Sequence, residues 1–162
     1  MKNKTVWMMV GVPGSGKTWC AKNKMTHKPD WRYVSRDEIR FNLVSANEEY
    51  FSKEKEVFKQ FVNAINRAFE EENVFNVIAD ATHLNEASRN KLRRALPNDY
   101  NIIPVVVTCD YSTIVTRNAS REGRACVPEY ILHRMYNQFE DPESDIYKYS
   151  KIIRINNNKG GI

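Results

Sequence analysis

The sequence predicts an α/β fold, with a five-stranded, mainly parallel sheet and helices on both of its faces. Two observations lead to this fold class. Short apolar segments alternate with helical patterns along the whole chain, as happens where right-handed crossovers join parallel strands. A glycine-rich motif of the kind that binds phosphate follows the first apolar segment, where a strand would end and a helix begin.

Size and composition predict a single domain over residues 1–162. The chain has 162 residues, of which 41% are hydrophobic and 28% charged, enough for one core. No apolar run approaches the roughly 20 residues of a membrane span, and the amino-terminal segment reaches glycine and proline too soon for a signal peptide. Cys20, Cys109 and Cys126 are scattered, which argues against disulfides and zinc. We therefore expect a cytoplasmic protein without a membrane segment.

Five short apolar segments predict the strands. The intervals between them contain helical patterns. The expected strands are residues 5–10, 33–35, 74–79, 102–108 and 152–155.

Helix signals occupy the intervals in order. Downstream of Tyr50, apolar residues recur every three or four positions and predict a long amphipathic helix against the sheet: Val57, Phe61, Ile65, Ala68 and Phe69.

The later helices are marked by their ends. Asn85 is typical of an N-cap, and Pro97 ends that helix after Leu96. Another helix is expected after Asp110, and one begins with Pro128 at its first position. Only residues 156–162 are expected to form a loose tail.

The strongest motif is the run from Gly11 to Thr18, a complete G-x-x-x-x-G-K-[ST] pattern. Its glycines let backbone amides turn toward phosphate oxygens, and the next helix points its positive end at them. Lys17 adds a charge near the β and γ phosphates, and Thr18 offers a hydroxyl to Mg²⁺. A merely structural turn would need neither side chain. The predicted nucleotide-binding residues are Gly11, Pro13, Gly14, Ser15, Gly16, Lys17 and Thr18.

A second candidate group follows the second strand. Asp37 and Arg40 are three residues apart on one side of a helix that starts at the ligand-binding edge of the sheet. Asp37 fits a base that takes the proton from an attacking hydroxyl, and Arg40 fits a clamp for phosphate. A helix-start carboxylate with a solvated arginine explains the pair equally well, and Glu38 is assigned to the solvated face.

The third strand ends in Asp80, a position from which a carboxylate commonly supports Mg²⁺ directly or through water. Thr82 and Asn85 fit caps of the following helix. His83 is interpreted as a surface or capping histidine, since neither His27 nor His133 has metal-ligand spacing to it.

Residues 112–127 are predicted to form a mobile lid, with Arg117 and Arg121 on one helix face and Arg124 after a glycine. Lid arginines can bind the nucleotide and stabilise charge that develops during transfer. A basic, solvated helix end remains an alternative. The net charge of +5 and pI near 9.1 favour polyanionic partners without requiring them.

Taken together, GVPGSGKT, SRDEIR, ATHLN and RNASREGRACVPEYILHRMYNQF resemble, in that order and over most of the chain, the kinase domain of bacteriophage-type polynucleotide 5'-hydroxyl kinases. The resemblance implies a P-loop kinase fold with an arginine-bearing lid, the cofactors ATP and Mg²⁺, and the cytoplasm of a bacterial or phage-infected cell. It also implies roles for single residues: Lys17 and Thr18 as phosphate and magnesium residues, Asp37 as general base, Arg40 as acceptor-side phosphate contact and Arg121 as lid arginine.

The sequence departs from this family at two points. The carboxylate that the family places just before the threonine falls here on Ala81, with Asp80 one residue earlier. No D-x-D-x-T motif occurs, so no 3'-phosphatase activity is expected.

The expected function is transfer of the ATP γ-phosphate to the 5'-hydroxyl end of DNA or RNA. The alternatives are a related kinase for another hydroxyl, such as a nucleoside, a small alcohol or a hydroxymethylated base in DNA, and a non-catalytic nucleotide switch. The choice between DNA and RNA, the kind of end, the donor base and the oligomeric state are left open.

Overall fold

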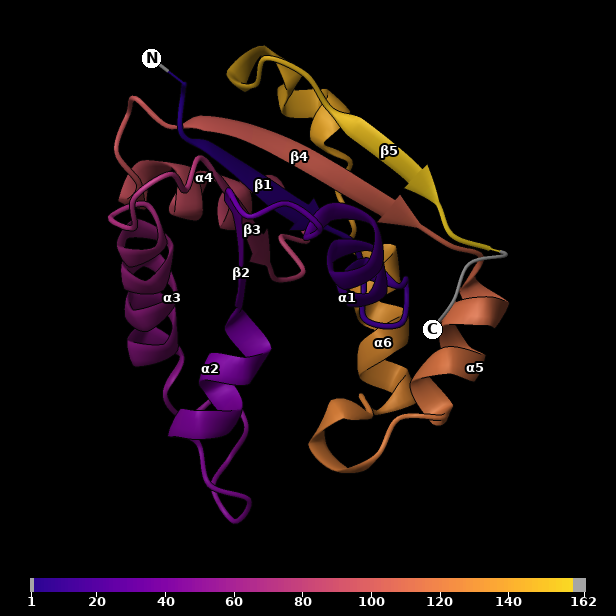
Figure 1. Cartoon of the computed structure of the whole chain (residues 1–162). Coiled ribbons are helices and arrows are strands. Elements are labelled where there is room, and N and C mark those ends of the chain that lie inside the picture. Colours follow the sequence, from indigo (N-terminus) through magenta and orange to yellow (C-terminus); the bar gives the residue numbers. More distant parts are fainter. Residues whose placement is uncertain (1, 159–162) are drawn as a thin grey trace.

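A computed structural model describes residues 2–158 of the chain (Figure 1). Its sheet has five strands in the order β2-β3-β1-β4-β5, and every neighbouring pair is parallel. The predicted fold class is confirmed, and the strands differ from the expected ranges by one or two residues at their ends. The strands are β1 (Thr5–Val10), β2 (Trp31–Ser35), β3 (Asn76–Asp80), β4 (Asn101–Thr108) and β5 (Ile153–Asn156).

Nine helical segments connect and cover the strands within residues 2–158. Most coincide with the predicted helices, including the long amphipathic one. They are α1 (Lys17–Cys20), η1 (Ala21–Met25), α2 (Arg36–Leu43), α3 (Glu54–Ala68), α4 (Glu86–Ala95), α5 (Tyr111–Ala119), η2 (Gly123–Ala125), α6 (Glu129–Asn137) and η3 (Pro142–Lys148).

The helices form layers on both faces of the sheet (Figure 1). On one face, Phe61 and Ile65 of α3 and Leu92 of α4 belong to a buried cluster with the central strands. On the other face, Cys20 and Ala21, at the junction of α1 and η1, pack against β-strand residues. Figure 1 shows α2 and the segment from α5 to α6 extending on opposite sides beyond the carboxyl ends of the strands.

Helix starts follow the predicted caps where a polar side chain is present. The Ser35 hydroxyl accepts a hydrogen bond from the Glu38 amide at 3.2 Å and caps α2. Asn85 caps α4 in a reciprocal capping box with Ser88. Pro128 stands one position before α6 and not at its first helical residue.

Two expectations about segment ends are wrong. Helix α5 ends at Ala119, so Arg117 and Arg121 do not share a helix face. The tail is not loose from residue 156, because Asn156 closes β5 and Asn157 is only 1% exposed. The remainder of the expected tail, residues 159–162, lies outside the described residues.

Over residues 2–158, no helix has the length and apolar character needed to cross a membrane.

Candidate active site

The loop between β1 and α1 is closely packed at its glycines. Gly14 and Gly16 have φ angles of 85° and 93°, which side-chain-bearing residues rarely adopt. A Cβ at Gly14 would lie 2.9 Å from the carbonyl oxygen of Ile114, and one at Gly16 would collide with the Asn157 side chain. Both positions therefore need glycine for space as well as for backbone conformation.

Distant segments hold this loop in place. The Ser15 carbonyl accepts hydrogen bonds from Nη1 of Arg117 at 3.5 Å and from Nδ2 of Asn157 at 3.1 Å. Nη2 of Arg117 also donates to the Asn157 carbonyl at 2.8 Å, and only 6% of Arg117 is exposed. Arg117, predicted to bind nucleotide, is thus a buried residue that braces the back of the loop.

Lys17 lies at the centre of the candidate site. Its Nζ donates to the Val12 carbonyl at 3.2 Å, and burial lowers the pKa of its amine below the ordinary value. The charges of Asp80 and Asp37 act in the opposite direction on this pKa, while Arg121 lowers it further. Charged side chains from β3, α2 and the segment after α5 thus act on the pKa of the loop lysine.

Asp80 receives two hydrogen bonds on one carboxylate oxygen. Oγ1 of Thr18 and the Tyr33 hydroxyl both donate to its Oδ2 at 2.7 Å. Burial, reinforced by the Asp80 charge, raises the pKa of Tyr33, so this phenol stays protonated and remains a donor. The set consists of hard oxygen atoms, which are the ligands that Mg²⁺ prefers, and Thr18 and Asp80 therefore fit that ion.

Tyr33 was missed by the sequence analysis. It belongs to β2, whose residue Ser35 pairs with Asp80 in β3. Only the pairing of these two strands brings the phenol to the carboxylate, and the sequence alone does not give that pairing.

A second cluster surrounds Asp37 at the start of α2. The Asp37 side chain is 65% exposed, and its Oδ1 accepts hydrogen bonds from Nη1 of Arg40 and from the Tyr50 hydroxyl, the latter at 3.2 Å. No hydrogen bond within residues 2–158 reaches its other oxygen, Oδ2. The predicted proximity of Asp37 and Arg40 is present, and one carboxylate oxygen remains open.

Arg40 is buried and held by two carboxylates, which the sequence did not indicate. Its Nε and Nη2 donate to the two carboxylate oxygens of Glu54 at 2.6 and 3.1 Å, and only 6% of the residue is exposed. Burial alone would lower the pKa of this guanidinium, but the hydrogen bonds to Glu54 and the nearby charges raise it. Arg40 therefore fixes Asp37 in place. Glu38, by contrast, lies at the surface as expected, in a 3.2 Å ion pair with Lys22.

The two arginines that follow α5 in the predicted lid, Arg121 and Arg124, make different contacts. Nη1 of Arg121 donates to the Ala125 carbonyl at 3.4 Å, and its charge acts on Lys17. Arg124 crosses to the end of α2, where it donates to the carbonyls of Val44 and Phe41 at 2.5 and 3.4 Å and covers the Phe41 ring at 5.0 Å. Arg124, predicted to bind nucleotide, instead joins the lid segment to α2.

His83 is not a surface histidine, contrary to expectation. It is 3% exposed, has a φ of 42°, and its ring nitrogen Nδ1 donates to the Met9 carbonyl at 2.6 Å. The chain turns inward here because the preceding residue, Thr82, offers its carbonyl to the Gly11 amide at 3.0 Å. Burial lowers the pKa of His83 to about 4, so the imidazole is neutral near pH 7.

Comparisons with known proteins agree with this architecture. A family model described as an AAA domain matches residues 6–142. A chain in the structure of the Pnkp1/Rnl/Hen1 RNA repair complex superposes with a TM-score of 0.72 at 21% identity, covering 85% of this chain and 44% of that one. This chain thus spans less than half the length of that relative.

Two further solved structures are similar over most of the chain. A sugar kinase from Janibacter sp. HTCC2649 has a TM-score of 0.64 at 17% identity, covering 95% of this chain and 85% of that one. A fungal RNA kinase has a TM-score of 0.62 at 13% identity, covering 100% and 79%. At these identities the likeness establishes a P-loop kinase-like fold.

Proposed function

The chain belongs to the AAA domain family, and from that premise we propose that it is an ATP-dependent phosphotransferase that phosphorylates the 5'-hydroxyl end of DNA or RNA. One observation carries the proposal: an exposed carboxylate, Asp37, is held through Oδ1 by a buried arginine, and no hydrogen bond within residues 2–158 reaches its Oδ2. A nucleotide switch would have no use for that carboxylate.

The donor side of the reaction needs a triphosphate held with its charge neutralised. The backbone of the glycine-rich loop and the Lys17 amine supply this for ATP, and Thr18 and Asp80 would hold Mg²⁺. Held there, Mg²⁺ would offset the negative charge of the phosphates. Tyr33 orients Asp80 by its hydrogen bond, so that this carboxylate keeps one direction.

On the acceptor side, Asp37 acts as the general base. Its Oδ2 accepts the proton of the attacking hydroxyl, whose oxygen forms a bond to the γ-phosphorus as the bond to the bridging oxygen of ADP breaks. Arg40 and Tyr50 hold Oδ1, which leaves Oδ2 to face the hydroxyl. Arg121, whose charge acts on Lys17, is suited to stabilise the phosphoryl group in transit.

We propose that the acceptor is a polynucleotide. The net charge of +5 and the likeness to two RNA-repair and RNA-kinase structures support it. The likeness to a sugar kinase over 95% of the chain supports a small alcohol as the second candidate.

An acceptor screen tests the proposal. The protein is incubated with γ-labelled ATP and Mg²⁺ together with 5'-hydroxyl DNA, 5'-hydroxyl RNA, a nucleoside or a sugar alcohol, and transfer of label is measured. Label should enter the oligonucleotides, and Asp37→Asn should abolish most of it. If label entered the sugar alcohol alone, the acceptor would be a small alcohol and not a polynucleotide. If no acceptor changed the rate of ATP turnover, phosphotransfer would be refuted.

A further inference from the structure

Arg36 sits beside the proposed base with part of its guanidinium unused. Its Nη2 donates to Oε2 of Glu54 at 2.9 Å, while its Nε has no partner within residues 2–158. The side chain is 21% exposed, and its guanidinium carbon lies 5.5 Å from the centroid of the Phe58 ring. A cation with spare donor capacity therefore adjoins Asp37 on the α3 side.

The Phe58 ring leads from Arg36 to a second cation on another helix. Nζ of Lys91, in α4, lies 4.3 Å from the centroid of the same ring. Lys91 is exposed and forms no ion pair with a carboxylate in the described part of the chain. Phe58 is half-buried at the margin of the core, so this contact lies at the surface between α3 and α4.

The outer face of α4 continues the positive charge. Five residues on one side of the helix line a hollow of about 600 Å³: Ala87, Asn90, Lys91, Arg94 and Ala95. Arg94 is exposed and, like Lys91, is not paired with a carboxylate anywhere in residues 2–158. Because alanine side chains are short, an extended anionic chain could approach the helix backbone closely beside Lys91 and Arg94.

Two other cations near α4 are paired with carboxylates. Arg89 of α4 is fully buried and paired with Asp145 at 2.8 Å, and Lys148 pairs with Glu86. Lys91 and Arg94 thus remain unpaired with carboxylates within residues 2–158, and together with Arg36, which is paired with Glu54, they form a row with Phe58 between Arg36 and Lys91. We call this row the α4 basic track.

We propose that the α4 basic track holds the sugar-phosphate backbone of a single-stranded acceptor as it leaves the reaction site, with Phe58 beside a sugar or base. The inference rests on the proposed polynucleotide kinase activity and deepens it. Phosphates repeat along a strand, so successive cations are needed, and an aromatic ring among them suits single-stranded nucleic acid. A sugar or a free nucleoside carries no repeated charge that would use Lys91 or Arg94.

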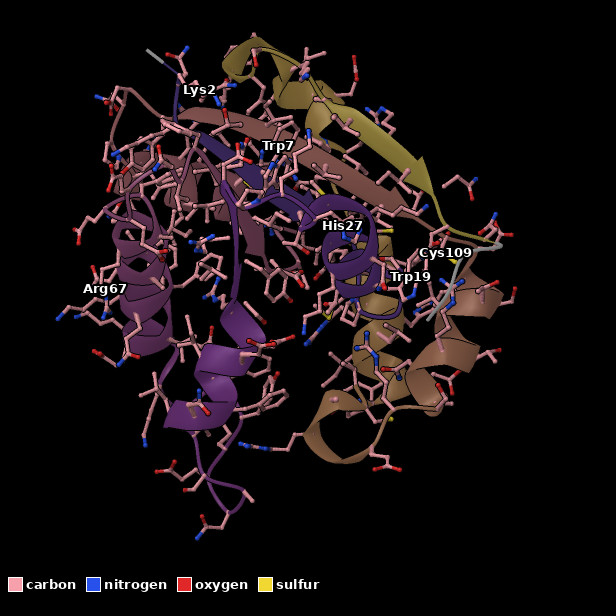
Figure 2. The ribbon with its side chains drawn as sticks, viewed as in Figure 1. Lys2, Trp7, Trp19, His27, Arg67 and Cys109 are labelled. Carbon is pink, nitrogen blue, oxygen red and sulfur yellow. The ribbon has the colours of Figure 1, made fainter. Side chains whose placement is uncertain are left out.

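The test compares two double variants with the same change in charge. Lys91→Glu with Arg94→Glu reverses the track, and Lys28→Glu with Arg67→Glu is the control. Lys28 precedes β2 and Arg67 is in the last turn of α3; both are exposed and form no ion pair within residues 2–158, and Arg67 projects outward from α3 (Figure 2). The acceptors are a 5'-hydroxyl oligonucleotide of about 20 nucleotides, longer than the roughly 4–16 that a single-strand-binding domain covers, and a nucleoside 3'-monophosphate.

Reversal of the track should raise the KM for the oligonucleotide by about tenfold or more, with kcat retained, and should leave the KM for the nucleoside 3'-monophosphate unchanged. The salt slope of oligonucleotide binding should fall by roughly 1.4, since each lost phosphate contact removes about 0.7 for a single strand. The control variant should change neither quantity. The proposal would be overturned if both double variants changed the KM for the oligonucleotide equally, or if track reversal changed the KM for both acceptors equally.

Binding measured separately distinguishes failure of the track from failure of the proposed function. Fluorescence anisotropy of the labelled oligonucleotide needs no catalysis, and the Asp37→Asn protein can be used for it. If the wild type phosphorylates oligonucleotides but reversal changes neither KM nor binding, the track is wrong and the function stands. If the wild type neither binds nor phosphorylates oligonucleotides, both are wrong.

Discussion

Asp37 combines exposure with firm orientation, a combination that suits a base. One oxygen is fixed by Arg40 and Tyr50, and Arg40 is itself held by both oxygens of Glu54. The carboxylate thus keeps one geometry in the absence of an acceptor, so less ordering is required when the hydroxyl arrives.

Asp37→Asn should lower turnover by about 10² to 10⁴, because the amide cannot accept the proton while its shape is retained. ATP affinity should stay within a few fold, since Asp37 does not line the phosphate loop. Single-turnover transfer and equilibrium binding of ATP measure the two quantities. Unchanged turnover would remove Asp37 from the chemistry.

His83 gives the protein a stability that depends on pH. Burial, with smaller effects from neighbouring cations, lowers the pKa of this histidine from an ordinary 6.5 to about 4. Between these values the unfolded chain binds the proton and the folded chain does not. The stabilisation is therefore complete above pH 6.5 and is lost as the pH falls toward 4, by about 1.4 kcal/mol per pH unit.

Replacement of His83 by Asn should remove this dependence, because Asn tolerates a positive φ and does not titrate. Between about pH 7 and about pH 5, the wild type should lose about 2 kcal/mol more unfolding free energy than the variant. Urea unfolding at the two pH values measures it. Parallel losses in both proteins would mean that another group titrates.

Among the elements, the lid segment uses its two arginines for different purposes. The charge of Arg121 lowers the pKa of Lys17, whereas Arg124 donates hydrogen bonds to carbonyl groups at the end of α2. The sequence predicted both as nucleotide contacts because it could not show that α2 ends opposite the lid.

Arg121→Ala should lower the rate of the chemical step by about 10² or more, as loss of an arginine that stabilises transferring phosphate does. Arg124→Ala should lower it less than about tenfold, because only the link to Phe41 and Val44 is lost. Rapid-quench measurements with saturating ATP compare the two. The reverse order of effects would assign the transition-state role to Arg124.

Helix α4 is tied to η3 by an ion pair that is entirely buried. Arg89 and Asp145 are both 0% exposed, and the Tyr149 hydroxyl also donates to Asp145 at 2.9 Å. Such a pair adds little relative to apolar residues, yet breaking it leaves an isolated charge in the core.

Asp145→Asn should therefore lower the unfolding free energy by about 3–5 kcal/mol. Arg154→Gln, which breaks exposed pairs with Asp141 and Glu143, is the control and should cost about 0–1 kcal/mol for each pair. Denaturant titration of both variants measures the difference. A loss for Asp145→Asn no larger than that of the control would mean that the core takes in water at this point.

For the molecule as a whole, local sequence patterns were sufficient to predict the helices and strands. They were not sufficient to predict the contacts between side chains on different elements. The glycine motif, the apolar periodicity of α3 and the cap at Asn85 are encoded within a few residues, and each was predicted. Tyr33 on Asp80 and Glu54 on Arg40 depend on strand order and helix packing, which join residues far apart in sequence. The end of α5 at Ala119 was not predicted, because no proline or glycine directly follows that residue.

The hold of Asn157 on the Ser15 carbonyl spans 142 positions of the chain. On a translating ribosome, the asparagine that braces the glycine-rich turn is added 142 residues after Ser15. The nascent chain would thus lack this support of the glycine-rich loop until Asn157 has been added. A polypeptide released before that point would carry the whole motif and yet hold ATP poorly.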